Sequence, residues 1–336
     1  MMKPRQLVRL AISSVGPGAI ILAYHRVADL DTDPQLLAVS REQFEGQMKV
    51  LSERFKVIPL SDVLTRTKPS HTPRIAITFD DGYRDNLSYA APILRKLDLP
   101  ATFFVSTGYI GEKREFWWDE LESIMLHGEL PHQLILNLPG QNLAFELPDR
   151  GGPVDPKWDV TQLHDPGSRY TIYRRMHSVL RTTHPLKRDQ ILDYLWEWKC
   201  DDKVVRTTHL PLRSRDVTKL GDGELLSIGS HGITHSVFSA LSAEEGCNEA
   251  TNSRRQLEEL VSVGVHSFSF PYGKKSDLNG SALRALSAGS YKLACANYTG
   301  WVNFLSDYRS LPRFLVRDWS AAEFSQHLGE WSSALP

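Results

Sequence analysis

Short apolar runs, rich in β-branched and aromatic residues, alternate along this chain with longer stretches whose apolar residues recur every three or four positions. The short runs predict buried strands, and the longer stretches predict amphipathic helices. The predicted strands cover residues 19–24, 75–79, 101–106, 225–230, 265–270, 291–296 and 313–316. Strands separated by helices form parallel sheets, because the crossover returns the chain to the same end of the sheet. We therefore expect an α/β fold, with the sheet either open or closed into a barrel.

One long segment, residues 113–219, departs from this alternation. It contains a predicted hairpin around residues 139–142 and a helical stretch near 168–199, and we interpret it as a mixed α/β insertion over the mouth of the barrel. The expected division of the chain is an N-terminal helix (1–18), a main body (19–112 and 220–320), the insertion (113–219) and a C-terminal helix or tail (321–336).

Composition excludes several classes of function. The chain has 336 residues, 41% hydrophobic and 24% charged, which is ordinary for a globular protein with a sizeable core. A formal net charge of −1 without blocks of like charge gives no argument for a nucleic-acid partner. The three scattered cysteines, Cys200, Cys247 and Cys295, predict neither a disulfide framework nor a CxxC metal pair.

The first residues superficially resemble a signal peptide, with basic residues followed by apolar ones. Arg9 interrupts the apolar run, and Gly16-Pro17-Gly18 ends it before a cleavage-type pattern. The chain also has no run of about 18 apolar residues, the length that a membrane span requires. We therefore expect no transmembrane segment and a cytoplasmic location.

Two adjacent carboxylates follow the predicted strand at residues 75–79. In "RIAITFDDGYRDN" (74–86), Asp80 and Asp81 come directly after the apolar run. Asp and Gly commonly open loops, which is one interpretation. The other is functional, because α/β folds place their chemistry at the carboxyl ends of parallel strands.

Two histidines follow a second predicted strand in the same way. In "LLSIGSHGITHS" (225–236), His231 and His235 lie four positions apart, so a compact loop or a helical turn points both imidazoles in one direction. Two histidines and one carboxylate form a three-ligand set for a catalytic divalent metal that leaves a position open. An HxxxH pair alone is weak evidence for a metal site. Its combination with Asp80-Asp81 at the end of another strand favours one.

The motifs "ITFDDGY" and "SIGSHGITHS" resemble the first two motifs of the polysaccharide deacetylase family, also called NodB-homology proteins or carbohydrate esterase family 4. "FSFPYG" (268–273) resembles the third motif, in the variant form of bacterial exopolysaccharide deacetylases. The resemblance covers roughly residues 19–112 and 220–318, and "FWWDEL" (116–121) also occurs in similar bacterial proteins.

This resemblance implies a distorted (β/α) barrel that removes acetyl groups from N-acetylated sugars or glycans with one divalent metal, usually zinc. By position, Asp81, His231 and His235 would bind the metal. Asp80 would be the general base that takes a proton from the attacking water.

Two departures from the family pattern stand out. The third motif usually carries an arginine that orients the base, whereas this chain has "FSFP" at 268–271. We expect Arg313 to replace that arginine. The alternative is that Arg313 forms a salt bridge on the surface. The usual late histidine is also absent from "LPRFLVRDW" (311–319). Instead, "LAYHRV" (22–27) resembles the "YHR" of a circularly permuted subgroup, in which the strand that supplies the general acid comes first. We therefore expect His25 to be the general acid rather than a buried structural histidine.

Further roles are expected around these motifs. Tyr272, after Pro271, resembles the residue whose backbone N–H faces the developing oxyanion, although a Pro-Tyr-Gly turn that closes a strand is an equal alternative. Phe116, Trp117 and Trp118 are candidates to stack on sugar rings, but three consecutive aromatic residues cannot share one face, so at least one belongs to a core. Despite several histidines, we expect no second acid/base constellation in the insertion.

The sequence thus predicts a metal-dependent carbohydrate N-deacetylase. An amidohydrolase acting on a small non-sugar amide and a glycan-binding pseudoenzyme remain the alternatives. The second is disfavoured because a binding protein does not need Asp80, Asp81, His231 and His235 together. The missing export signal favours a cytoplasmic precursor sugar over a wall polymer.

Overall fold

A computed structural model describes residues 18–65, 72–138 and 141–333. The predicted N-terminal helix, apart from Gly18, and the turn residues 139–140 lie outside these residues. The chain divides into two compact units. Unit 1 comprises Met1–Asp29, Leu37–Gly111 and Leu212–Pro336, and unit 2 comprises Leu30–Leu36 and Glu112–Pro211. Residues 212–219, assigned to the insertion above, thus lie in unit 1, and Leu30–Leu36 lie in unit 2.

Unit 1 is built on a parallel sheet whose strand order is β11-β10-β9-β6-β5-β1-β12. These strands are β1 (Ala19–Tyr24), β5 (Arg74–Phe79), β6 (Ala101–Val105), β9 (Leu226–Ser230), β10 (Ser267–Ser269), β11 (Leu293–Cys295) and β12 (Phe314–Leu315). All seven were predicted. Three two-residue strands were not predicted: β4 (Lys56–Val57), which pairs with the start of β5, and the parallel pair β2 (Arg26–Val27) and β3 (Ala38–Val39). Two residues are too short to show a periodicity.

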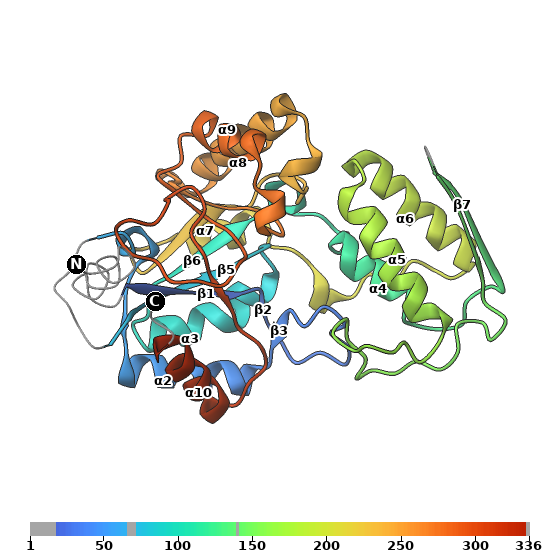
Figure 1. Cartoon of the computed structure of the whole chain (residues 1–336), viewed down its shortest axis with the longest axis horizontal. Coiled ribbons are helices and arrows are strands. Elements are labelled where there is room, and N and C mark those ends of the chain that lie inside the picture. Colours follow the sequence, from blue (N-terminus) through green and yellow to red (C-terminus); the bar gives the residue numbers. More distant parts are fainter. Residues whose placement is uncertain (1–17, 66–71, 139–140, 334–336) are drawn as a thin grey trace, which may run out of the picture. The chain divides into compact units, whose positions relative to one another are not determined.

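The sheet is curled, and the predicted distorted (β/α) barrel is confirmed in this form (Figure 1). Helices cover its outer side. They are α2 (Arg41–Arg54), α3 (Ala91–Lys96), α7 (Ser214–Leu220), α8 (Ala243–Val261), α9 (Gly280–Ala288) and α10 (Ala321–Ser333). Helices α2, α3 and α10 gather along one side of the strands, and α8 lies against α9 on another (Figure 1). The strands are almost fully buried because both faces of the sheet are covered.

The first strand, β1, lies between β5 and the terminal strand β12 of this sheet. β1 pairs in parallel with β5 over its whole length, with Tyr24 opposite Phe79, and with β12 through Leu22–Phe314 and Ala23–Leu315. The expectation that β1 and β12 are neighbours is therefore confirmed. Because all strands run in the same direction, the residues that follow β1, β5, β9 and β10 emerge at one edge of the sheet.

Unit 2 contains α4 (Trp117–Met125), the antiparallel hairpin of β7 (Gln133–Leu138) and β8 (Gln141–Glu146), α5 (Ser168–Thr182) and α6 (Pro185–Lys199). Every residue of α4 is buried, and so is Phe116 before it. The expectation that Phe116, Trp117 or Trp118 stacks on substrate is wrong, because all three rings pack in the interior. In the described residues, no helix combines the length and apolar character needed to cross a membrane.

Candidate metal centre and catalytic site

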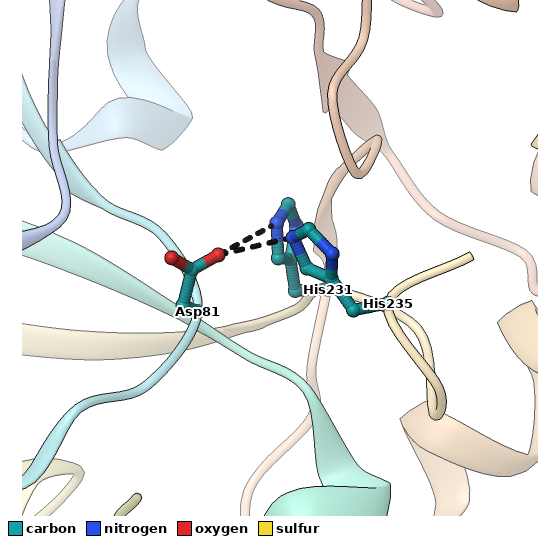
Figure 2. Close-up of side chains that lie close together, drawn as sticks. All are labelled: Asp81, His231 and His235. Atoms are coloured by element: carbon teal, nitrogen blue, oxygen red, sulfur yellow. Dashed lines mark ion pairs between the residues drawn. The ribbon is translucent and has the colours of Figure 1, made fainter. Parts of the chain in front are cut away.

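Asp81, His231 and His235 converge at the carboxyl edge of the sheet, after β5 and β9. Nε2 of His231 lies 3.4 Å from Oδ1 of Asp81, and Nε2 of His235 lies 3.1 Å from the same oxygen. Figure 2 shows both imidazoles directed at this carboxylate. All three residues are buried, and their donor atoms lie within 4.8 Å of one another. The structure thus brings together the three predicted ligands, whose role as ligands stays a prediction.

The histidine tautomer suits a divalent metal. Nδ1 of His231 lies 2.7 Å from the backbone carbonyl oxygen of Ser269. A carbonyl oxygen only accepts hydrogen bonds, so Nδ1 carries a proton, and Nε2 is the nitrogen that faces Asp81. A histidine that binds a metal commonly has its other nitrogen held in this way. The donor set of two imidazoles and one carboxylate fits zinc or a similar divalent ion.

The backbone at this site adopts sparsely populated conformations. Asp81 and His235 have φ angles of 72° and 52°, and Gly82 and Gly232 have 95° and 76°. Non-glycine residues rarely adopt positive φ, and such strain concentrates at functional sites. A side chain at Gly232 would also clash, because an added Cβ would lie 2.9 Å from Oε2 of Glu249.

Glu249 of α8 holds the loop between the two histidines. Its Oε2 accepts hydrogen bonds from the backbone N–H groups of Ile233 (2.6 Å) and Thr234 (3.0 Å), and its Oε1 accepts one from the Thr234 hydroxyl (2.7 Å). Sequence analysis missed this residue, because only the fold brings α8 against the loop.

Asp80, the predicted base, forms a buried ion pair with Arg313. Nη1 of Arg313 donates to Oδ1 of Asp80 at 2.7 Å, and Nη2 donates to Oδ2 at 2.6 Å. This two-bond geometry is the strong form of an arginine–carboxylate contact. Arg313 is 1% exposed, so the surface alternative for this residue is wrong. The structure places it where the sequence analysis expected a replacement for the missing motif arginine.

The electrostatics of the two aspartates favour their ionised forms. Burial alone raises the pKa of Asp81, but hydrogen bonds from His231 and His235 outweigh it, so this pKa lies below its ordinary value. Burial also raises the pKa of Asp80, and the charge of Arg313 outweighs that effect, so the pKa of Asp80 is lowered as well. Both carboxylates are therefore negative at neutral pH.

His25 follows β1 at the same edge, half-buried and close enough to interact electrostatically with Asp80, Asp81 and Arg313. Burial lowers the pKa of His25, and the two carboxylates oppose this only in part. Desolvation of the imidazolium is the larger effect, so the pKa of His25 lies below its ordinary value.

The loop after β5 fixes the backbone on both sides of His25. The Asn86 side chain donates to the His25 carbonyl oxygen at 2.9 Å. Asp85 forms a buried ion pair with Arg26 at 3.0 Å and accepts a hydrogen bond from the Val27 N–H at 3.2 Å. Sequence analysis missed Asp85 and Asn86 as parts of the site, although both stand at the end of the quoted stretch 74–86.

Tyr272 also lies at this edge, after β10. Its φ angle is 61°, and its ring packs edge-on against His235, with centroids 4.9 Å apart. The N–H of Gly273 donates to the Pro271 carbonyl oxygen at 2.7 Å, which closes the tight turn. The turn interpretation therefore describes this segment, and the oxyanion role of the Tyr272 N–H stays a prediction.

A second cluster of metal-type side chains lies in unit 2. Donor atoms of Asp119, Glu122 and His209 lie within 4.8 Å of one another, and all three residues are buried. The expectation that this segment holds no second acid/base constellation stays a prediction, because the proximity of these side chains does not by itself make a catalytic site.

Arg206 occupies the centre of this second cluster. Its Nη1 lies 3.1 Å from Oε2 of Glu122, its Nη2 lies 2.8 Å from Oε2 of Glu115, and Nη2 also donates to the Asp119 carbonyl oxygen at 2.8 Å. Oε1 of Glu122 accepts a hydrogen bond from the Thr32 hydroxyl. Both oxygens of Glu122 are thus engaged and Glu122 pairs with a cation that it shares with Glu115, so we interpret this cluster as a buried ion-pair network.

Comparison with known proteins agrees with the fold and the motifs. The sequence profile described as Polysaccharide deacetylase matches residues 67–131. YxkH of Bacillus subtilis is 31% identical over 112 residues, covering 32% of this chain and 39% of that protein. A poly-beta-1,6-N-acetyl-D-glucosamine N-deacetylase of Staphylococcus aureus is 34% identical over 110 residues, covering 28% of this chain and 38% of that protein. The matched region thus spans about two fifths of these relatives.

Solved structures share the fold over almost the whole chain. IcaB from Ammonifex degensii superposes with a TM-score of 0.56 at 15% identity, covering 95% of this chain and 98% of that structure. The Streptococcus pyogenes deacetylase PplD gives a TM-score of 0.53 at 16% identity, covering 93% and 99%. The matched profile and the sequence relatives thus show that part of this chain is similar to polysaccharide deacetylases, and the solved structures show that the chain shares their fold.

Proposed function

We propose that this protein is a metal-dependent hydrolase that removes N-acetyl groups from an N-acetylated sugar or glycan. The observation that carries the proposal is the arrangement of Asp80, clamped by Arg313, directly beside the converging Asp81, His231 and His235. A relative named as a poly-beta-1,6-N-acetyl-D-glucosamine N-deacetylase supports a glycan as the substrate class.

One divalent cation, with zinc as our proposal, would be held by Asp81, His231 and His235. When bound, the ion would polarise the amide carbonyl and lower the pKa of water from ~15.7 toward ~7. Asp81 contributes a negative charge to this site because its pKa is lowered by its two histidine contacts. His231 would offer Nε2 to the ion, because the Ser269 carbonyl holds a proton on Nδ1.

The remaining residues move protons and orient the substrate. Asp80 is ionised and held in place by Arg313, so it takes a proton from the attacking water. His25 supplies a proton to the departing amine, which is a poor leaving group as an anion. The lowered pKa of His25 makes its imidazolium a stronger proton donor. The Tyr272 N–H is our candidate for the oxyanion contact.

The decisive experiment measures acetate release from oligomers of N-acetylglucosamine by the purified protein, with and without chelator, followed by re-addition of Zn²⁺. We expect activity that chelator abolishes and Zn²⁺ restores. Activity on small acetamides but not on sugars would favour the amidohydrolase alternative. Saturable binding of the oligomers without acetate release would favour the glycan-binding pseudoenzyme.

A further inference from the structure

Ser269, the last residue of β10, contacts both halves of the site through different atoms. Its hydroxyl donates a hydrogen bond to Oδ2 of Asp80 at 3.2 Å and accepts one from Nη2 of Arg313 at 3.0 Å. Its backbone carbonyl accepts the Nδ1–H of His231 at 2.7 Å. Ser269 is fully buried, so water does not compete for these contacts.

These hydrogen bonds distinguish the two oxygens of Asp80. A carboxylate oxygen has two lone-pair directions. On Oδ2, the described residues supply two donors, Arg313 Nη2 and the Ser269 hydroxyl. On Oδ1 they supply one, Arg313 Nη1. The lone-pair direction that none of these donors occupies is therefore on Oδ1, and this oxygen can accept a proton.

The rest of the Arg313 guanidinium is also engaged, which fixes the clamp. Nε donates to the Ala296 carbonyl oxygen at 2.9 Å, and Nη1 donates to the Thr78 hydroxyl at 3.2 Å. Arg313, which directly precedes β12, reaches Asp80 from there, whereas the usual third motif carries its arginine in the segment where this chain has the small Ser269. A serine at the end of β10 leaves room for the Arg313 side chain to contact the base.

We propose that Ser269 is a positioning residue that occupies the second lone pair of Asp80 Oδ2 and thereby makes Oδ1 the oxygen that accepts the proton. Through its carbonyl, the same residue links the orientation of the base to that of His231. The proposal goes beyond the proposed deacetylase function and rests on it.

The test compares Ser269→Ala, Ser269→Thr and Ser253→Ala in the full chain. Ser269→Ala removes the hydroxyl but keeps the carbonyl bond to His231, so we expect kcat for acetate release to fall about tenfold with unchanged KM and Zn²⁺ content. Ser269→Thr keeps a hydroxyl and should stay within about threefold of wild type. Ser253→Ala removes an equally buried hydroxyl that contacts Ser230 and Ala250, and should leave kcat unchanged.

A crystal structure of Ser269→Ala provides a readout that does not depend on activity. We expect the Asp80 carboxylate to turn away from its two-bond contact with Arg313. An unchanged carboxylate, or equal kcat in wild type and Ser269→Ala, would overturn the role of Ser269 and leave the deacetylase proposal intact. A wild-type protein that releases no acetate from any N-acetylated sugar would instead overturn the proposed function. A loss of Zn²⁺ from Ser269→Ala would show that the residue only supports His231.

Discussion

The two clusters of carboxylates and histidines, one in each unit, have similar composition and different electrostatics. Asp81, His231 and His235 in unit 1 and Asp119, Glu122 and His209 in unit 2 each bring three buried donor atoms within 4.8 Å of one another. In unit 1, no lysine or arginine of the described residues forms an ion pair with Asp81. In unit 2, Arg206 pairs with Glu122 at 3.1 Å.

This difference decides which cluster suits a cation. Burying a carboxylate is costly unless a positive charge accompanies it. Arg206 already supplies that charge in unit 2, where its own pKa is raised by the surrounding carboxylates although burial opposes this. In unit 1 the ion-pair partners of Asp81 within the described residues are the two imidazoles, with no lysine or arginine among them, so a divalent ion would provide a compensating positive charge. Proximity of metal-type side chains is therefore a weaker criterion than the balance of charge around them.

The double substitution His231→Ala/His235→Ala should have the largest effect and tests the unit 1 side of the comparison. Removing two of three predicted ligands should abolish stoichiometric Zn²⁺ binding and all acetate release. Metal content after dialysis against a weak chelator measures the first effect. The matched control, His209→Ala in unit 2, should keep one equivalent of Zn²⁺. If the double variant keeps its metal and His209→Ala loses it, the assignment of the two clusters is reversed.

Asp80→Asn should have the next largest effect and separates the base from the ligands. The amide keeps the shape of the side chain but cannot accept a proton, so kcat should fall at least ~10²-fold. Zn²⁺ content should stay near that of wild type, because Asp80 contacts Arg313 rather than the histidines. Loss of metal together with activity would make Asp80 a ligand.

Local patterns in the sequence explain why much of this site was predictable. Asp80, Asp81, His231 and His235 directly follow predicted strands, and parallel strands bring their carboxyl ends to one edge whatever the details of packing. The adjacency of β1 and β12 follows from the same geometry. The pairing of β1 with β5 places His25 beside the Asp80-Asp81 motif, which lies more than fifty residues further along the chain.

The contacts that hold these residues were not predictable in the same way. Glu249 and Ser269 act through bonds to backbone N–H and carbonyl groups, which carry no signal in the side-chain pattern. The error about "FWWDEL" has a related cause. The fold buries this segment, and a partner far along the chain accompanies its charge in the interior, because Lys203 forms an ion pair with Glu120.

His25→Ala should have an effect that depends on the substrate, and it sharpens the contrast because we propose a proton donor, His25, beside the unit 1 cluster. Cleavage of the amide should be nearly abolished, since the amine must leave with a proton. Hydrolysis of an aryl acetate should suffer far less, because a phenolate leaves unaided. Metal content should not change. Equal losses on both substrates would make His25 structural and place the acid elsewhere.

Arg206→Met should have the smallest effect on activity and a clear effect on stability, which tests the unit 2 side of the comparison. Removing the cation leaves Glu115 and Glu122 buried without their shared partner, so we expect a loss of about 3 kcal/mol in the free energy of unfolding. Urea denaturation, monitored by tryptophan fluorescence, measures this loss of stability. Unit 2 contributes to the signal because Trp117, Trp118 and Trp196 lie there. Arg150→Met, which removes an exposed pair with Glu129, should cost under about 1 kcal/mol.

The same denaturation experiment with Zn²⁺ distinguishes an ion-pair network from a metal site. In the His231→Ala/His235→Ala background, where only the second cluster remains, added Zn²⁺ should not shift the midpoint of the tryptophan transition. A ligand that binds only the folded state at a hundred times its Kd would stabilise it by about 2.7 kcal/mol, which such a measurement detects easily. A shift of that size that Glu122→Gln abolishes would show that unit 2 binds metal despite Arg206. Charge balance would then no longer separate the two clusters.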